Sequence, residues 1–203
     1  MTKIKICGMT NKEDAKKAVD FGADALGFIF YEKSPRHISV EKAKQIIKIL
    51  PPFVAKIGVF VDEDEKKVRQ IQSYCGLTAL QFHGNETIEY CSGFRNVIKS
   101  ICVAERLSVE QTKKYEHCVC AFLFDTYSAN KKGGTGQAFD WNLLKEIKTK
   151  KPVILAGGIK AENVDMAIST VKPYAIDSAS STESEPGKKD YDKMKKLIDI
   201  VKG

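Results

Sequence analysis

The chain has 203 residues, of which 43% are hydrophobic and 29% are charged, and its formal net charge is +7. This composition is typical of a globular protein with room for one large core or two small ones. The sequence has no apolar run long enough to span a bilayer and no secretory signal at its N-terminus, so we expect a cytoplasmic protein with reduced thiols and no membrane partner.

The positive charge is spread along the chain and does not form a cluster. Only four of the 33 basic residues are arginines, and lysines occur in nearly every polar segment. A nucleic-acid binder more often concentrates its charge and interleaves aromatic residues, so we expect no nucleic-acid partner. The six cysteines lack zinc-knuckle spacing and there are only three histidines, which argues against a metal site. A scattered positive field would still attract an anionic small molecule.

Short β-rich apolar runs alternate with amphipathic stretches from one end of the chain to the other. Strands are predicted over residues 3–7, 23–30, 54–61, 79–83, 97–103, 121–126, 152–157 and 174–179. Helices are predicted over residues 11–22, 40–50, 63–75, 85–93, 108–116, 140–148, 161–170 and 191–202. Eight strands that are each followed by a helix predict an α/β protein, a single-domain (βα)8 TIM barrel over residues 1–203. A doubly wound open sheet is the alternative, but its G-x-G-x-x-G turn is absent after the first strand.

Enzymes on this barrel work at the carboxyl ends of the strands, and Cys7 ends the first of them. A thiol at the barrel mouth can act as a nucleophile or, as a thiolate, as a base. Buried cysteine is also a common small hydrophobe, so residue type alone favours a structural role. Arg36 follows the second strand, where its planar fork suits a carboxylate or a phosphate, although a surface arginine is equally compatible with the sequence.

Polar residues also end the fourth and sixth strands. Gln81 and His83 are two apart, so both point to one face, as donors to a substrate or as a wall of the pocket. Asp125 ends an apolar run, where burial would raise the pKa of its carboxyl and let it donate a proton near neutrality. The glycine-rich residues 126–139 then form a long connection, which suits a cover that excludes water.

The last two strands lead into turns rich in glycine and serine. Gly157 and Gly158 let a backbone approach an oxyanion closely, and Ser180 and Ser181 can donate hydroxyl hydrogen bonds, in a turn that begins at Asp177. Barrels commonly bind phosphate at this position. Each turn alone reads as an ordinary βα connection, but the two together favour a phosphate site.

Several motifs taken together resemble one family along the whole chain. They are KICGMT, GFIFYEKSPRHIS, IGVFVD, LQFHG, FLFDTYSANKKGGTGQAFDW and LAGGI. Their combination is similar to phosphoribosylanthranilate isomerase of tryptophan biosynthesis. The resemblance implies a cofactor-free Amadori rearrangement of N-(5-phosphoribosyl)anthranilate to 1-(2-carboxyphenylamino)-1-deoxyribulose 5-phosphate.

The resemblance also implies roles for the site residues. Asp125 would be the general acid that protonates the ring oxygen, and Cys7 the general base that removes the C2 proton. Arg36 would bind the anthranilate carboxylate, and the last two turns would bind the phosphate of this phosphorylated substrate. The resemblance leaves open whether the protein is a monomer or a homodimer.

The chain departs from the family at the last turn. The usual pattern is Asp-x-Ser-Ser-Gly-x-Glu, and residues 177–183 read DSASSTE, with Ala179 for a serine and Ser181 for the glycine. Phosphate binding through backbone N–H groups would tolerate these changes if Ser181 can adopt the φ required of it.

Two other functions are compatible with parts of the sequence. One alternative is another barrel enzyme that acts on a sugar phosphate. An epimerase would usually need a metal or paired carboxylates at the mouth, and indoleglycerol-phosphate synthase would need a lysine acid at a strand end. The sequence shows neither feature. A basic non-catalytic binding protein, for instance one for RNA, draws only on the +7 charge.

Overall fold

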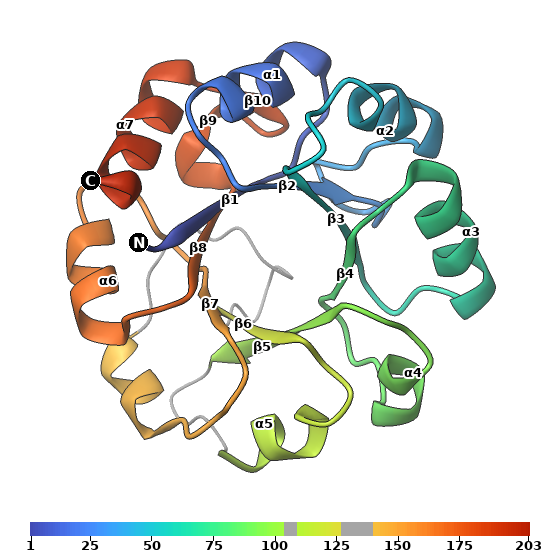
Figure 1. Ribbon diagram of the computed structural model, residues 1–203, viewed down its shortest axis with the longest axis vertical. Helices are drawn as coiled ribbons and strands as arrows, with labels where there is room; N and C mark the ends of the chain where they lie inside the picture. Colours follow the sequence, from blue (N-terminus) through green and yellow to red (C-terminus); the bar gives the residue numbers. More distant parts are fainter. Residues whose placement is uncertain (104–108, 127–139) are drawn as a thin grey trace.

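The computed structural model describes residues 1–103, 109–126 and 140–203. Its centre is a closed barrel of parallel strands in sequence order, with helices around it (Figure 1). The barrel strands are β1 (Lys3–Cys7), β2 (Ala25–Ile29), β3 (Ala55–Phe60), β4 (Ala79–Phe82), β5 (Val97–Val103), β6 (Ala121–Thr126), β7 (Val153–Leu155) and β8 (Ala175–Ser178). The predicted eight-stranded barrel is therefore confirmed, and the open-sheet alternative is excluded.

The described helices lie outside the barrel, where six of them connect successive barrel strands and the last one follows the final strand. They are α1 (Lys12–Asp20), α2 (Val40–Ile47), α3 (Glu65–Cys75), α4 (Ile88–Ser92), α5 (Val109–Tyr115), α6 (Val164–Val171) and α7 (Tyr191–Lys202). Polar side chains begin most of them, as where Asn11 accepts a hydrogen bond from the Asp14 N–H and Asp64 accepts one from the Lys67 N–H. None of the helices in the described ranges is long and apolar enough to cross a membrane.

The helix predicted over residues 140–148 is instead a 3-10 helix, Trp141–Glu146. Its apolar residues Trp141, Leu144 and Ile147 recur at every third position, which matches a turn of three residues better than one of 3.6. Trp141 and Leu144 are buried by this arrangement. Backbone hydrogen bonds from Leu143 to Asp140 and from Ile147 to Leu144 hold it.

Alternation of side chains along each strand creates two separate apolar cores. The outward residues, among them Ile4 and Ile6 of β1, pack under the helices. A second cluster fills the barrel interior and consists of Ala25, Ile57, Ile98, Ala121, Leu123, Ile154, Ala156 and Ala175. Inward positions nearer the carboxyl ends of the strands are polar, so the interior changes from apolar to polar toward the mouth.

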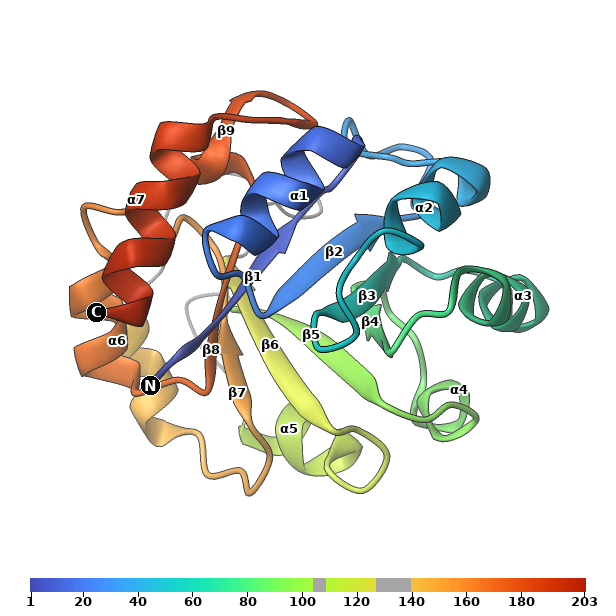
Figure 2. The ribbon, with the colours of Figure 1, turned by 45° about the horizontal axis from the view of Figure 1, so that its top comes forward.

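A short hairpin that the sequence patterns did not predict follows β8. Its strands are β9 (Glu183–Glu185) and β10 (Lys188–Lys189), and Gly187 between them has a φ of 85°. Figure 2 shows β9 at the end of the barrel toward which the strands point. The hairpin thus brings Glu183 and Lys189 to the barrel mouth.

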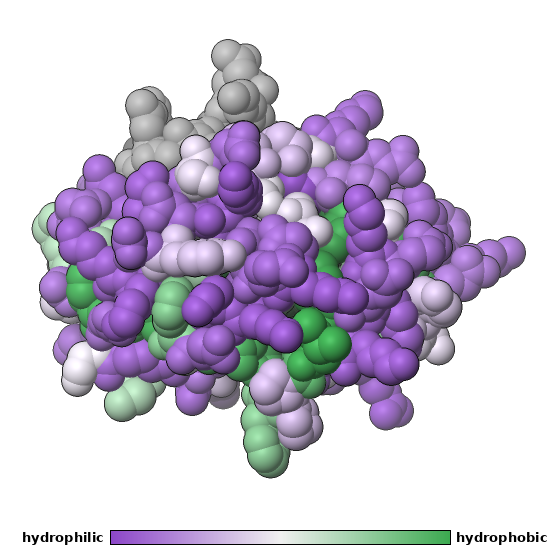
Figure 3. All heavy atoms as spheres, turned by 90° about the horizontal axis from the view of Figure 1, so that it is seen from above, coloured by the Kyte–Doolittle hydropathy of each residue, from purple (hydrophilic) through white to green (hydrophobic). Residues whose placement is uncertain are grey.

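The molecular surface is mostly polar. On the face shown in Figure 3, hydrophilic residues cover most of the surface and the hydrophobic areas are small and separate. This distribution agrees with the prediction that the lysines are scattered over a solvent-exposed surface.

Candidate active site

The structure brings the predicted acid and base residues together on the inner face of the barrel mouth. Cys7 ends β1, Asp125 lies near the end of β6 and Asp177 lies in β8, and all three are buried. Side chains alternate between the two faces of a strand, so Cys7 points the same way as Lys5, whereas Ile4 and Ile6 face the helices.

The Cys7 thiol occupies space that a glycine on the neighbouring strand leaves open. Cys7 pairs with Gly27 in the β1–β2 register, and a Cβ added to Gly27 would lie 2.5 Å from the Cys7 Sγ. The N–H groups of Gly8 and Met9 both donate to the Gly27 carbonyl at 3.0 Å. Gly27 is therefore a site residue that the sequence analysis missed, and its only signal was a glycine inside a strand pattern.

A buried ion pair lies beside the thiol. Lys5 Nζ is 2.8 Å from Asp177 Oδ1, and the two side chains are 3% and 9% exposed. Burial disfavours the charged ammonium of Lys5, but the Asp177 carboxylate and the Cys7 sulfur offset this and raise its pKa. Lys5 is thus a positively charged neighbour of Cys7 on the same strand face.

The Cys7 thiol has its pKa raised above the ordinary value. Burial is the largest cause, because it disfavours the thiolate, and the Asp177 carboxylate acts in the same direction. The ammonium groups of Lys5 and Lys189 oppose this shift. The thiolate is therefore a strong base whose formation depends on nearby positive charge.

The Asp125 carboxyl has the properties of a proton donor. Burial, with a smaller contribution from the Asp177 carboxylate, raises its pKa to about 6, although a hydrogen bond from Thr126 N–H and the charge of Lys5 oppose the shift. The Thr126 N–H lies 2.7 Å from Asp125 Oδ1, and His83 Nε2 lies 3.5 Å from Oδ2. This confirms the expected burial of Asp125 and its raised pKa.

Gln81 and His83 share one face of the mouth, as the sequence predicted. Gln81 Nε2 lies 3.1 Å from His83 Nδ1. With the Gln81 amide as the donor, the imidazole carries its proton on Nε2, on the side of Asp125. Within the described part of the chain, Gln81 Oε1 is a buried acceptor that has no hydrogen-bond partner.

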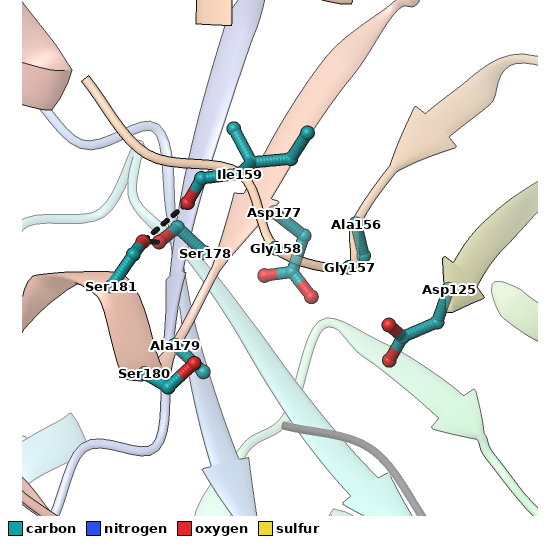
Figure 4. A pocket seen from close by; sticks show the side chains of 10 residues that line it. All are labelled: Asp125, Ala156, Gly157, Gly158, Ile159, Asp177, Ser178, Ala179, Ser180 and Ser181. Atoms are coloured by element: carbon teal, nitrogen blue, oxygen red, sulfur yellow. Dashed lines mark hydrogen bonds between the residues drawn. The ribbon is translucent and has the colours of Figure 1, made fainter. Parts of the chain in front are cut away.

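A pocket at the ends of β6, β7 and β8 contains the predicted phosphate-binding turns. Its lining residues are labelled in Figure 4: Asp125, Ala156, Gly157, Gly158, Ile159, Asp177, Ser178, Ala179, Ser180 and Ser181. Gly157 and Gly158 have φ values of 80° and 64°, and a Cβ on Gly157 would lie 2.2 Å from Thr126 Oγ1. Both glycines therefore suit the left-handed backbone conformation, and Gly157 also allows the close approach to β6.

Ser181 makes contacts that differ from its expected role. It lies in the 3-10 helix Ser180–Thr182 and has no positive φ, so the replacement of the family's glycine causes no backbone strain there. Its hydroxyl donates to the Ile159 carbonyl, which leaves the Ser178 hydroxyl, 2.7 Å away, as a donor to it (Figure 4). We expected this hydroxyl group to donate to phosphate, but its hydrogen bond instead connects the β7 turn to the β8 turn.

Arg36 also has a partner that the sequence analysis did not identify. Its Nε and Nη2 atoms form a fork with Glu183, at 2.9 Å from Oε1 and 2.8 Å from Oε2 respectively. The guanidinium group is mostly buried, and Nη1 takes no part in these bonds. Glu183 therefore fixes the orientation of the arginine while a second edge of the guanidinium stays available to an anion.

Residues 127–139, most of the connection for which we predicted a cover over the site, lie outside the described residues, and that prediction is untested.

Comparison with known proteins gives a consistent result. The family model described as N-(5'-phosphoribosyl)anthranilate (PRA) isomerase matches residues 4–200. The isomerase of Pelobacter propionicus is 46% identical over 203 residues, covering 100% of this chain and 96% of the relative. The isomerase of Geobacter sulfurreducens is 43% identical over 204 residues, covering 100% of each.

Solved structures agree with the sequence comparisons. Phosphoribosyl anthranilate isomerase from Thermotoga maritima has a TM-score of 0.93 at 42% identity, with both chains fully covered. An isomerase in complex with reduced 1-(o-carboxyphenylamino)-1-deoxyribulose 5-phosphate has a TM-score of 0.88 at 41% identity, again with full coverage of both chains.

Proposed function

The chain belongs to the N-(5'-phosphoribosyl)anthranilate isomerase family and catalyses the Amadori rearrangement of tryptophan biosynthesis, and we propose that Cys7 is its general base and Asp125 its general acid. The observation that carries this proposal is their shared position on the inner face of the mouth, where Asp125 has a pKa of about 6 and Cys7 has cationic neighbours. Cys102 of β5 pairs with Asp125 in the β5–β6 register, but it is exposed, whereas the Cys7 thiol is buried beside Lys5 and Asp177.

The proposed sequence of proton transfers conserves atoms and electrons. Asp125 donates a proton to the furanose ring oxygen, and the bond between that oxygen and C1 breaks to give a Schiff base with the anthranilate nitrogen. The Cys7 thiolate removes the proton from C2, and the electron pair moves to form an enolamine. Loss of the C2 hydroxyl proton and protonation at C1 yield the ketone, so that C2 is oxidised and C1 is reduced within one molecule.

Substrate binding is proposed to use the two ends of the mouth. The backbone N–H groups near Gly157 and Gly158, with Ser180, bind the phosphate, because these residues line the pocket between β7 and β8. Arg36 binds the anthranilate carboxylate through its free guanidinium edge. The buried Gln81 Oε1 accepts a substrate hydroxyl group, and His83 orients Asp125. Asp177, whose carboxylate pairs with Lys5, holds that ammonium beside the thiol.

A direct assay tests the proposed roles. Phosphoribosylanthranilate is generated in situ and its loss is followed by fluorescence, with the Cys7→Ala and Asp125→Asn variants measured beside the unaltered protein. Rescue of an isomerase-deficient tryptophan auxotroph gives a second readout. Normal growth and turnover with either variant would remove that residue from the mechanism.

The pH dependence of kcat/KM should show reverse protonation, in which the general acid has a lower pKa than the general base. The acid has a pKa of about 6, below that of the base, which is raised above the ordinary thiol value. The active form needs Asp125 protonated and Cys7 ionised, so it is a minor species at every pH. We expect kcat/KM to be flat between the two pKa values and to fall on either side. A profile that falls steadily above pH 7 would contradict this arrangement.

Gly27→Ala should lower turnover because it displaces the Cys7 sulfur. The added Cβ would collide with the Cys7 Sγ, and displacement of a reacting group by about 1 Å costs on the order of 100-fold in kcat. Overpacking should also lower stability by about 1–3 kcal/mol. Thermal unfolding of Gly27→Ala with and without Cys7→Ala gives the control, because removal of the sulfur should relieve most of the loss. An equal loss in both backgrounds would mean that the backbone is the cause.

We also propose that the chain is one domain over residues 1–203, acts in the cytoplasm, and is a monomer or a homodimer. In support, the strands of one closed barrel run from Lys3 to Ser178 and α7 ends at Lys202. A Thermotoga maritima isomerase described as dimeric, from which monomers were generated, is a structural relative at 39% identity and a TM-score of 0.87. Light scattering on the purified protein decides between the two states.

A further inference from the structure

Lys189 places a fully buried ammonium group at the barrel mouth. Its side chain is 0% exposed, whereas the side chain of neighbouring Lys188 in β10 is 66% exposed. The Lys189 Nζ donates to the Cys7 carbonyl at 2.7 Å, to the Ala179 carbonyl at 3.0 Å and to Glu183 Oε1 at 3.2 Å. The three donors of the ammonium are therefore matched by three acceptors.

Each of these acceptors belongs to a different part of the proposed site. The Cys7 carbonyl ends the strand that carries the base, and Ala179 begins the turn that lines the phosphate pocket. Glu183 holds the guanidinium group of Arg36. A single side chain thus connects the base, the phosphate turn and the arginine.

The other charged side chains around the thiol cancel in pairs, so Lys189 gives the group a net positive charge. Lys5 on β1 pairs with Asp177 on β8, and Arg36 from the β2–α2 connection pairs with Glu183 on β9. Lys189 on β10 is the remaining cation among these groups, and it also contacts Glu183. Burial lowers the pKa of Lys189, and the nearby charge of Arg36 acts in the same direction. Glu183 and Cys7 act in the opposite direction. A positive charge kept there despite burial favours a negative charge on the adjacent sulfur.

We propose that Lys189 is a positioning residue of the isomerase reaction, which fixes Cys7 relative to the phosphate turn and supplies the net positive charge beside the Cys7 thiol. This inference rests on the proposed role of Cys7 as the base. No sequence pattern indicated this role, because Lys189 lies in a lysine-rich segment 182 residues from Cys7.

The test compares Lys189→Met, which retains length and removes charge, with Lys188→Met as the matched control. The pKa of Cys7 is measured from ultraviolet thiolate absorbance, after subtraction of the same protein carrying Cys7→Ala. For Lys189→Met we expect this pKa to rise by about one unit or more. Because the flat region of kcat/KM depends on the difference between the two pKa values, it should fall about tenfold and its alkaline limb should move up by the same amount. KM should also rise, since the phosphate turn loses a bond, and Lys188→Met should change none of these values.

An unchanged Cys7 pKa and an unchanged alkaline limb in Lys189→Met would overturn the proposal, even if stability fell. If Lys189→Met does not fold, Lys189→Gln, which keeps an N–H donor without the charge, is titrated in its place with the same expected rise. Lys189→Arg restores the charge and should return the thiol pKa toward its starting value. Thiolate titration needs no substrate, so it is independent of the Cys7→Ala turnover assay that tests the base itself.

Discussion

Asp125→Asn is expected to lower kcat by about 10²- to 10⁴-fold, the usual contribution of a general acid. The asparagine side chain keeps an oxygen that can accept the Thr126 N–H bond, so the geometry at the end of β6 should survive. Loss of fluorescent phosphoribosylanthranilate measures the effect. Asp20→Asn, at an exposed position in α1, is the matched control and should leave turnover unchanged.

The same substitution should make the protein more stable at neutral pH. The pKa of Asp125 rises from its ordinary value of 3.8 to about 6 on folding, so its contribution to stability is full below 3.8 and is lost as pH rises through 6. A neutral asparagine avoids that loss, which amounts to about 3 kcal/mol above pH 6. Denaturant unfolding at pH 8 and at pH 4 should show a stabilised variant at pH 8 and a much smaller difference at pH 4. A destabilised variant at pH 8 would show that the buried carboxylate carries no such cost.

Cys7→Ala should remove the base and lower kcat by a similar factor of about 10²- to 10⁴-fold. Cys7→Ser should not restore turnover, because a hydroxyl group is far less acidic than a thiol and forms almost no alkoxide at neutral pH. Steady-state kinetics on both variants measure the loss, and retained substrate binding shows that the phosphate and carboxylate sites are intact. Cys75→Ala, at a buried thiol in α3 away from the mouth, is the control. Near-normal kcat in Cys7→Ala would assign the C2 proton to another group.

Local patterns were sufficient for the residues at the strand ends. Cys7, Gln81 and Asp125 each stand at a position that alternation along a single strand assigns to the barrel interior, so their common inward direction was predictable. The raised pKa of Asp125 was predictable for the same reason, because an apolar run before a carboxyl implies burial. The roles of these residues as acid and base remain proposals that the variants test.

Contacts between distant segments were not predictable in this way. Glu183 lies 147 residues from Arg36, and no spacing rule connects them. The hydroxyl of Ser181 reaches the β7 turn, a partner that the residues around it in sequence do not indicate. Gly27 and Lys189 are equally hidden, because a glycine in a strand and a lysine among lysines are common features with many explanations.

The sequence by itself therefore determined the barrel, the order of its strands and which residues end them, since these follow from hydrophobic periodicity that each segment carries alone. Only the tertiary structure decided which charges meet around the Cys7 thiol. A thiolate at the end of the first strand needs positive charge nearby, because burial disfavours its ionised form. Lys5 from the same strand and Lys189 from a hairpin near the other end of the chain supply this charge. They meet at one buried sulfur because the barrel closes and the hairpin folds over its mouth.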